Sequence, residues 1–238
     1  MPEFSLSNPT RPIHVGVILM NSTTEALDVV PVDLLHGVSQ KFIEDMPTLI
    51  PAPLQTQGLP IEFHWVSEHG RQDVRHLSSG LNVTPTDSFA DCPPLDIVLV
   101  GAHHLDYVLS AAEVGFVQKA YAGCAAFMTV CGGVQVAVEA GLVAGKTVTG
   151  PRFMLARFRA AAPEAAAWVE KRFVQDGKLW TSGALHNGLD MMAAFMRQTW
   201  PRKEGEGPTL VDFGLVLGSG LDRDIDYKDE PQLEIPVA

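Results

Sequence analysis

Residues 125–141 read Ala-Ala-Phe-Met-Thr-Val-Cys-Gly-Gly-Val-Gln-Val-Ala-Val-Glu-Ala-Gly. The first six residues are almost all apolar, which favours a strand buried on both faces of a parallel sheet. Cys131 follows at once with two glycines, and residues 134–140 have helical character before Gly141. The stretch therefore predicts a strand, a tight turn at Cys131 and a helix, which is the setting of a nucleophile elbow.

Similar patterns recur on both sides of this stretch. We expect strands at residues 13–20, 61–66, 81–85, 96–100 and 146–149, a hairpin at 173–181 around Asp176-Gly177, and a strand-like run at 210–217. Helices are expected at 110–122 and 189–200, over most of 152–172, and from a first turn at Pro31 to about residue 39. Strands that alternate with helices predict a doubly wound, mostly parallel α/β sheet.

The predicted organisation is one domain with two tails. A flexible N-terminal arm covers residues 1–11 and the domain covers 12–201. A C-terminal extension at 202–238 is expected to pack on the domain or to be partly disordered. No internal repeat is visible.

Composition excludes several function classes. The 238 residues are 46% hydrophobic, enough to bury a substantial core. A formal charge of -11 disfavours nucleic acid and anionic membrane surfaces as partners. The charge-free residues 120–138 are interrupted by glycines, so no membrane span is predicted. The N-terminus lacks the pattern of a secretory signal, and three cysteines form no framework, so a cytoplasmic location is expected.

Cys131 is the candidate nucleophile. A helix amino end beside it is expected to lower the thiol pKa, and backbone N–H groups after it to receive a developing oxyanion. The alternative is that Cys131 is a small buried apolar residue, as free cysteines often are. Cys92 and Cys124 lack this context and are interpreted as structural.

Four segments together resemble one known family. They are residues 26–35, 87–100, 130–149 and 173–190, and the similarity spans about residues 13–200. On these segments the chain resembles the DJ-1/PfpI superfamily, in particular the branch of isonitrile hydratases and their fungal relatives.

The resemblance implies a flavodoxin-like, class I glutamine amidotransferase-like sandwich that forms a homodimer. It also implies a carboxyl group from the first βα segment beside the cysteine thiolate, and Asp28 is the best match, with Glu25 and Asp33 as alternatives. A protonated carboxyl there would donate a hydrogen bond to the thiolate and move protons. The competing interpretation is that Asp28 caps a helix.

The chain departs from the family pattern at three places. Gly132 stands where hydratase relatives commonly carry Thr, Gly101-Ala102-His103 replaces Pro-Gly-Gly, and Gly150 replaces the histidine of protease-like members. The last change argues against a Cys-His peptidase. The backbone N–H groups of His103 and Gly132 still qualify as oxyanion donors, since a backbone donor does not depend on its side chain.

His186 lies in the loop expected to close over Cys131, where it would relay a proton or orient substrate; the alternative is a solvated loop histidine. His103 and His104 form a tandem pair without a third ligand at clear spacing, so no metal is predicted. Gly132-Gly133 falls short of a phosphate-binding fingerprint, so no nucleotide cofactor is expected.

The function predicted from these residues is a cysteine-dependent enzyme that acts on a small electrophilic substrate. By resemblance it is a lyase of the hydro-lyase class that hydrates an isonitrile to an N-formamide through a thiolate adduct. One alternative is glyoxalase-like conversion of a 2-oxoaldehyde. The other is a non-enzymatic redox-sensing or ligand-binding module in which Cys131 is oxidised without turnover.

Overall fold

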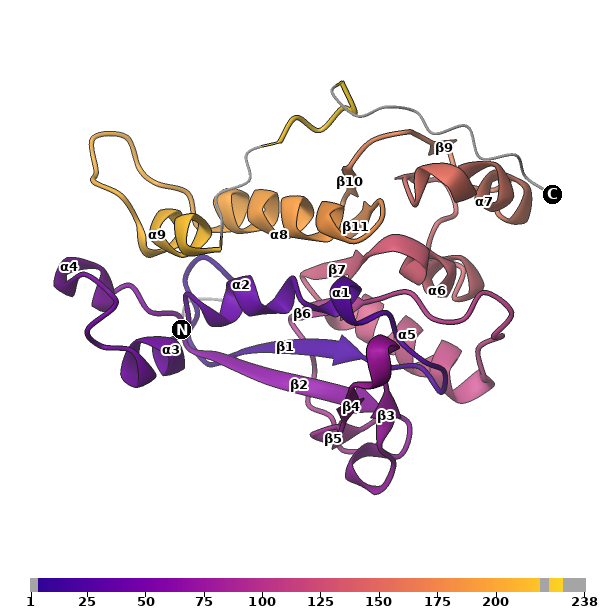
Figure 1. Ribbon diagram of the computed structural model, residues 1–238, viewed down its shortest axis with the longest axis horizontal. Coiled ribbons are helices and arrows are strands. Elements are labelled where there is room, and N and C mark those ends of the chain that lie inside the picture. Colours follow the sequence, from indigo (N-terminus) through magenta and orange to yellow (C-terminus); the bar gives the residue numbers. More distant parts are fainter. Residues whose placement is uncertain (1–3, 219–222, 229–238) are drawn as a thin grey trace.

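A seven-stranded sheet runs through the computed structural model, which describes residues 4–218 and 223–228 (Figure 1). The strand order is β10-β11-β7-β6-β1-β2-β5, and all neighbours are parallel except the β10–β11 pair. The strands are β1 (Ile13–Ile18), β2 (Ile61–Ser67), β5 (Asp87–Ser88), β6 (Ile97–Val100), β7 (Ala126–Thr129), β10 (Phe173–Asp176) and β11 (Leu179–Ser182). The predicted mostly parallel α/β sheet is confirmed.

Two small sheets and a set of helices complete the described chain. The small sheets pair β3 (Arg75–His76) with β4 (Asn82–Val83) and β8 (Thr147–Val148) with β9 (Ala167–Trp168). The helices are α1 (Ala26–Val29), α2 (Val32–His36), α3 (Gln40–Asp45), α4 (Ala52–Gln55), α5 (Ala111–Gly123), α6 (Val134–Glu139), α7 (Leu155–Ala161), α8 (His186–Thr199) and α9 (Leu210–Leu217). Short 3-10 turns include η3 (Cys131–Gly133) and η4 (Arg152–Met154).

Each face of the large sheet has its own apolar core. Alternate residues of β1 and β6, such as Val17 and Leu99, pack with α1, α2, α8 and α9 on one face. Val98 and Val100 of β6 point the other way and pack with α5, α6 and α7. The fully buried strands explain why their sequences are continuous apolar runs instead of alternating ones.

The chain crosses the sheet at one point. It builds β1, β2 and β5 outward in one direction, then returns to place β6, β7 and β11 on the other side of β1. In open α/β sheets, ligands bind outside the carboxyl ends of the strands at such a switch point. The segments that follow β1, β6 and β7 therefore define the edge at which a site is expected.

Two sequence predictions are wrong. Residues 210–217 form helix α9 and not a strand; Thr209 caps it, accepting a hydrogen bond from Asp212 N at 3.1 Å. A short apolar run fits a buried strand and a buried helix equally, and the capping pair decides here. Residues 152–172 are helical only as far as Ala161, and then form β9 beside β8.

Both tails of the described chain contact the domain. Trp200 Nε1 donates a hydrogen bond to the carbonyl oxygen of Leu6 at 2.7 Å, and Arg11 Nη1 pairs with Asp96 Oδ2 at 2.7 Å. Residues 223–228 lie against the loop before α8, as described below. The domain bounds themselves stay a prediction.

A membrane crossing needs a long apolar helix, and no helix in residues 4–218 or 223–228 meets that requirement.

The loop between β1 and α1 is hydrogen-bonded to one buried carboxylate, that of Glu113 in the first turn of α5. Glu113 accepts hydrogen bonds from Asn21 N at 2.6 Å, Tyr107 Oη at 2.7 Å and Ser110 N at 2.7 Å. The Ser110–Glu113 pair is the capping box of α5, and the predicted helix at 110–122 is confirmed. Because Asn21 precedes α1, this carboxylate fixes the path of the chain toward Asp28.

We expect Glu113→Gln to lower the free energy of unfolding by about 1–3 kcal/mol, because one buried donor loses its acceptor. Urea denaturation measures the change. Glu164→Gln, at an exposed position, is the control and should change the free energy by less than about 0.5 kcal/mol. Equal effects of the two substitutions would contradict the anchoring role of Glu113.

Candidate functional site

Cys131 occupies a tight turn between β7 and α6. Its φ is 57°, a left-handed conformation that is uncommon for residues other than glycine. Its backbone N–H donates to the carbonyl oxygen of Gly183 at 3.1 Å, which ties the turn to the loop before α8. The side chain is partly exposed, whereas the two glycines that follow it are buried. A non-glycine residue held in this conformation beside a sheet edge is a typical feature of functional sites.

Gly133 allows the turn to form. A Cβ at this position would stand 2.5 Å from Val100 O and 2.9 Å from the carbonyl carbon of Gly101. The start of α6 therefore packs directly on the backbone at the end of β6. Gly188 is similarly crowded, because a Cβ there would stand 2.8 Å from a methyl of Val130.

Asp28 is fully buried in α1, and its Oδ2 accepts a hydrogen bond from Ala102 N at 2.9 Å. It lies inside the helix and not at its N-cap, which is Glu25, so the helix-capping interpretation is wrong. Oδ1 makes no hydrogen bond of ordinary geometry within residues 4–218 and 223–228. The Cys131 side chain and the backbone of Leu185 nonetheless act on this carboxyl and lower its pKa.

Burial dominates the electrostatics of both groups. It raises the pKa of Asp28 to about 7, and the hydrogen bond from Ala102 opposes this rise only in part. Burial also raises the pKa of the Cys131 thiol to about 12, and the negative charge of Asp28 adds to the rise. The backbone N–H groups of Gly132 and Leu185 act in the opposite direction.

The expected lowering of the Cys131 pKa is therefore wrong in direction. Donors near the sulfur are present, but desolvation and the neighbouring carboxyl outweigh them. The proton arrangement is also reversed from the predicted one. Above pH 7 the pair consists of a thiol and a carboxylate, so Asp28 is placed to accept the proton from Cys131.

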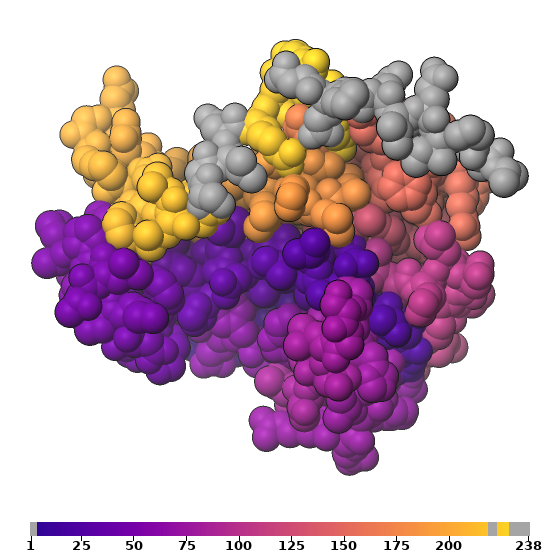
Figure 2. All heavy atoms as spheres, in the orientation of Figure 1, coloured from indigo at the N-terminus to yellow at the C-terminus, as the bar shows by residue number. Residues whose placement is uncertain are grey.

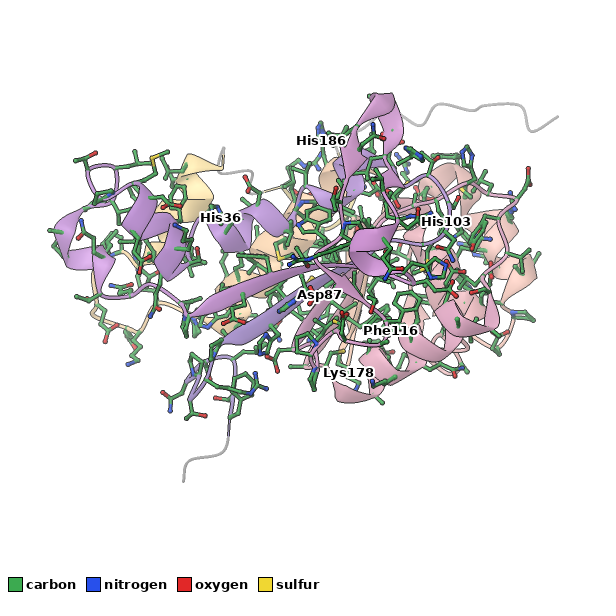
Figure 3. All side chains as sticks on the ribbon, turned by 90° about the horizontal axis from the view of Figure 1, so that it is seen from below. His36, Asp87, His103, Phe116, Lys178 and His186 are labelled. Carbon is green, nitrogen blue, oxygen red and sulfur yellow. The ribbon has the colours of Figure 1, made fainter. Side chains whose placement is uncertain are left out.

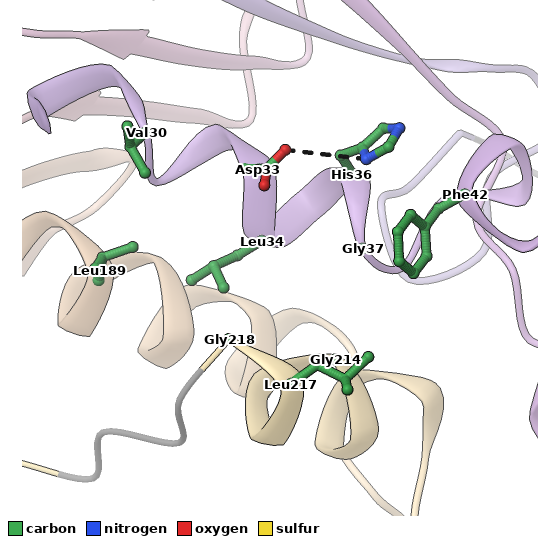
Figure 4. Close-up of a pocket in the computed structure, with 10 residues that line it drawn as sticks. All are labelled: Val30, Asp33, Leu34, His36, Gly37, Phe42, Leu189, Gly214, Leu217 and Gly218. Atoms are coloured by element: carbon green, nitrogen blue, oxygen red, sulfur yellow. Dashed lines mark ion pairs between the residues drawn. The ribbon is translucent and has the colours of Figure 1, made fainter. Parts of the chain in front are cut away.

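The two carboxyl groups predicted as alternatives to Asp28, those of Glu25 and Asp33, have other partners. Glu25 is near enough to raise the pKa of both Asp28 and Cys131, but its Oε1 accepts a hydrogen bond from Ser78 Oγ at 2.8 Å. Asp33 has an 84% exposed side chain and faces His36 at 3.9 Å. That pair lines a separate groove of about 300 Å³ between α2 and α9 (Figure 4). Of the three carboxyl groups, the structure brings Asp28 to the thiol.

The predicted oxyanion donors are the backbone N–H groups of Gly132 and His103. The N–H of Gly132 acts on the Cys131 sulfur, as its effect on the thiol pKa indicates. In the segment after β6, Ala102 N bonds Asp28, and the buried His103 ring donates from Nδ1 to His104 O at 2.9 Å. The role of the His103 backbone N–H stays a prediction.

His186 opens α8 and its side chain is exposed. Its neighbour Leu185 has φ 47°, and the N–H of Leu185 acts on both Asp28 and Cys131. Sequence reasoning found this loop through His186 but missed Leu185, since no residue type signals a leucine in this conformation.

Residues 223–228 pack on the first turns of α8 and on the loop before it. Arg223 Nη2 donates to Asp190 Oδ2 at 2.5 Å, and Asn187 Nδ2 donates to Tyr227 Oη at 2.7 Å. A Cβ on Gly183 would collide with this tyrosine hydroxyl. Figure 2 shows the segment lying over α8. Residues 223–228 therefore support the start of α8 and the loop whose carbonyl at Gly183 holds Cys131.

Comparison with known proteins identifies relatives of this arrangement. The model of the DJ-1/PfpI family matches residues 38–198. An isonitrile hydratase of Pseudomonas putida is 33% identical over 116 residues. That alignment covers 48% of this chain and 49% of the relative, so it spans about half the length of each.

Solved structures show the same fold. A ThiJ/PfpI family protein of Pseudomonas syringae superposes with a TM-score of 0.65 at 17% identity, covering 100% of this chain and 86% of the other. DJ-1beta of Drosophila melanogaster gives 0.63 at 15% identity, covering 87% and 98%. At these identities the likeness concerns the fold.

We expect Gly133→Ala to lower the free energy of unfolding by about 1–3 kcal/mol or more, because the new methyl group collides with the backbone of β6. Gly115→Ala is the matched control: it lies exposed in α5 with nothing within 4 Å of an added Cβ. It should raise the free energy by about 0.5–1 kcal/mol. Chemical denaturation measures both changes. An unchanged free energy of unfolding in Gly133→Ala would contradict the close approach of α6 to the end of β6.

Asp28→Asn should stabilise the protein increasingly as the pH rises. The folded pKa of about 7 lies above the ordinary 3.8, so the stability associated with protonated Asp28 is present at low pH and lost through pH 7. A shift of about three units predicts that the variant gains up to about 4 kcal/mol over wild type between pH 4 and 8. Thermal and urea unfolding across this range measure it. Asp33→Asn, which changes an 84% exposed carboxyl group, is the control.

Proposed function

Because this chain belongs to the DJ-1/PfpI family, we propose that it is a cysteine-dependent enzyme that adds water to a small electrophilic molecule, most simply an isonitrile. The observation that carries the proposal is the buried carboxyl of Asp28 beside the thiol of Cys131, at the carboxyl edge of the sheet. The similarity to an isonitrile hydratase over half the chain supports the choice of substrate class.

The chemistry follows from the order in which the two groups ionise. Asp28 as a carboxylate accepts the thiol proton while sulfur attacks the terminal carbon of R–NC. The same carboxyl then returns the proton to that carbon, which gives a thioimidate, R–N=CH–S–Cys131. Water adds to this carbon, the C–S bond breaks with return of a proton to sulfur, and R–NH–CHO leaves.

Gly132 and Leu185 supply the polar contacts that this scheme needs. Their backbone N–H groups act on the Cys131 sulfur and favour its anionic form as the proton leaves. These N–H groups are held in position by the fold. Cys131 N donates a hydrogen bond to Gly183 O, and residues 223–228 hydrogen-bond to Asn187 and Asp190 at the start of α8. Preorganised donors of this kind lower the barrier to a charged intermediate.

The thiol pKa favours an enzyme over a redox sensor. Sensor cysteines are exposed and largely ionised at neutral pH, which makes them reactive toward peroxide. Cys131 is mostly protonated there, because burial and Asp28 raise its pKa. Attack by this thiol needs a base, and the carboxylate of Asp28 is placed to act as that base. Homodimerisation, which the resemblance implies, and a cytoplasmic location, which the N-terminus and the cysteine content favour, stay predictions.

We expect the purified protein to convert a small alkyl isonitrile to the N-formamide, and kcat/KM to rise with pH through about 7 as Asp28 loses its proton. Cys131→Ser should lower turnover by about a thousandfold or more. Asp28→Asn should lower it by about a hundredfold and flatten the pH profile. Formamide release followed by mass spectrometry measures these values.

Cys92→Ser is the matched control and should keep full activity, since Cys92 lies in the loop before β6. Conversion of a 2-oxoaldehyde but not of isonitriles, lost in Cys131→Ser, would replace the hydratase by the glyoxalase-like alternative. Absence of turnover on both substrate classes would overturn the proposal.

A further inference from the structure

Two histidines and a glutamate gather on one face of β1 and β2, away from the site at Cys131. His14 pairs with Glu62 in the strand register, and His64 lies one pleat further along β2. His14 Nδ1 stands 3.0 Å from His64 Nε2 and 3.5 Å from Glu62 Oε2, and all three atoms lie within 4.8 Å of one another. The three side chains therefore aim their ligand atoms at one small volume.

The distances suit a tetrahedral metal ion. Zinc binds imidazole nitrogen and carboxylate oxygen at about 2.0–2.1 Å, so neighbouring ligand atoms lie about 3.3 Å apart. The two separations from His14 Nδ1, 3.0 Å and 3.5 Å, bracket this value. The side chain of Glu62 is 57% exposed, so it has room to adjust, and the open side leaves a position for water.

A further carboxylate orients His64. Asp87 Oδ2 lies 2.9 Å from His64 Nδ1, and the hydroxyl of Thr86 also bonds this carboxylate. With the Nδ1 proton donated to Asp87, the lone pair of His64 Nε2 faces His14. A carboxylate behind a histidine in this way is the usual support of a metal-binding imidazole. Figure 3 shows Asp87 among the strands of the sheet.

The backbone that carries the cluster is fixed as well. His14 N donates to Asp96 Oδ2 at 2.9 Å, and Arg11 pairs with the same carboxylate at 2.7 Å. The side chains of His14 and His64 are only 19% and 12% exposed, so their positions are constrained before any ion arrives. Preformed ligands lose little conformational entropy on binding.

We propose that His14 Nδ1, His64 Nε2 and the Glu62 carboxylate bind a divalent transition metal ion, with Zn²⁺ as the reference ion. Imidazole ligands favour zinc, nickel or copper over magnesium and calcium. Binding requires the Nδ1 proton of His14 to move to Nε2, with no net change in charge. The ion joins β1 to β2, and its role is to stabilise this part of the sheet.

This site is independent of the proposed catalysis. His14 lies four residues before the end of β1, about 13 Å along the strand from the carboxyl edge that carries Asp28 and Cys131. The competing explanation is a hydrogen bond between two imidazoles, with no role for metal. Metal titration separates the two explanations.

The experiment is a titration of the metal-free full chain with ZnSO₄, followed by calorimetry and by the shift in thermal unfolding. We expect one high-affinity ion per chain and a raised Tm in wild type and in Cys131→Ser, which removes the thiol as a competing ligand. His14→Ala should abolish the Tm shift. Asp87→Asn should weaken binding by about 10–100-fold. Glu62→Gln, at an exposed position, tests a ligand with little risk to folding.

His76→Ala is the matched control: this exposed histidine of β3 bonds Asn82 at 2.6 Å and should leave zinc binding unchanged. Equal zinc affinity in wild type, His14→Ala and Glu62→Gln would overturn the proposal, as would the absence of saturable binding. Visible absorption of the Co²⁺ form should show tetrahedral coordination, and loss of that spectrum in His14→Ala would assign it to this cluster.

Discussion

Helix α6 can start where it does only because Gly133 brings no side chain against the backbone at the end of β6. The close approach forces the chain to leave β7 through a left-handed residue, and that residue is Cys131. Its N–H then bonds Gly183, so the loop before α8 is held by the same turn. The end of β6, the turn at Cys131 and the loop before α8 are thereby held together around one sulfur atom.

The second constraint on the site is a buried carboxyl group, that of Asp28. Asp28 is removed from water and receives one good hydrogen bond, from Ala102, which is too little to restore its ordinary pKa. A group kept in this state destabilises the fold at neutral pH, and such a cost is typical of groups that handle protons. The sulfur of Cys131 shares the same dry environment, which links the ionisation of the two groups.

The fold was largely predictable, because a strand that is buried on both faces is a continuous apolar run, and such runs can be recognised in the sequence. The strands β1, β2, β6 and β7 follow from their apolar residues, and α5 matches the helix predicted at 110–122. The failures come from short segments. Residues 210–217 are apolar enough for a strand or a helix, and the Thr209–Asp212 capping pair selects the helix.

The sequence by itself determined the α/β architecture and the strand–Cys131–glycine order, because these depend on residue type and local spacing, whereas the choice of Asp28 over Glu25 and Asp33 needed the folded chain. Tertiary structure decided the rest. Desolvation set the direction of both pKa shifts, and it depends on everything packed around a group. The approach of His14 to His64, fifty residues apart, depends on strand register, which no local pattern records. These properties depend on contacts between residues that are distant in sequence, so they are visible only in the folded chain.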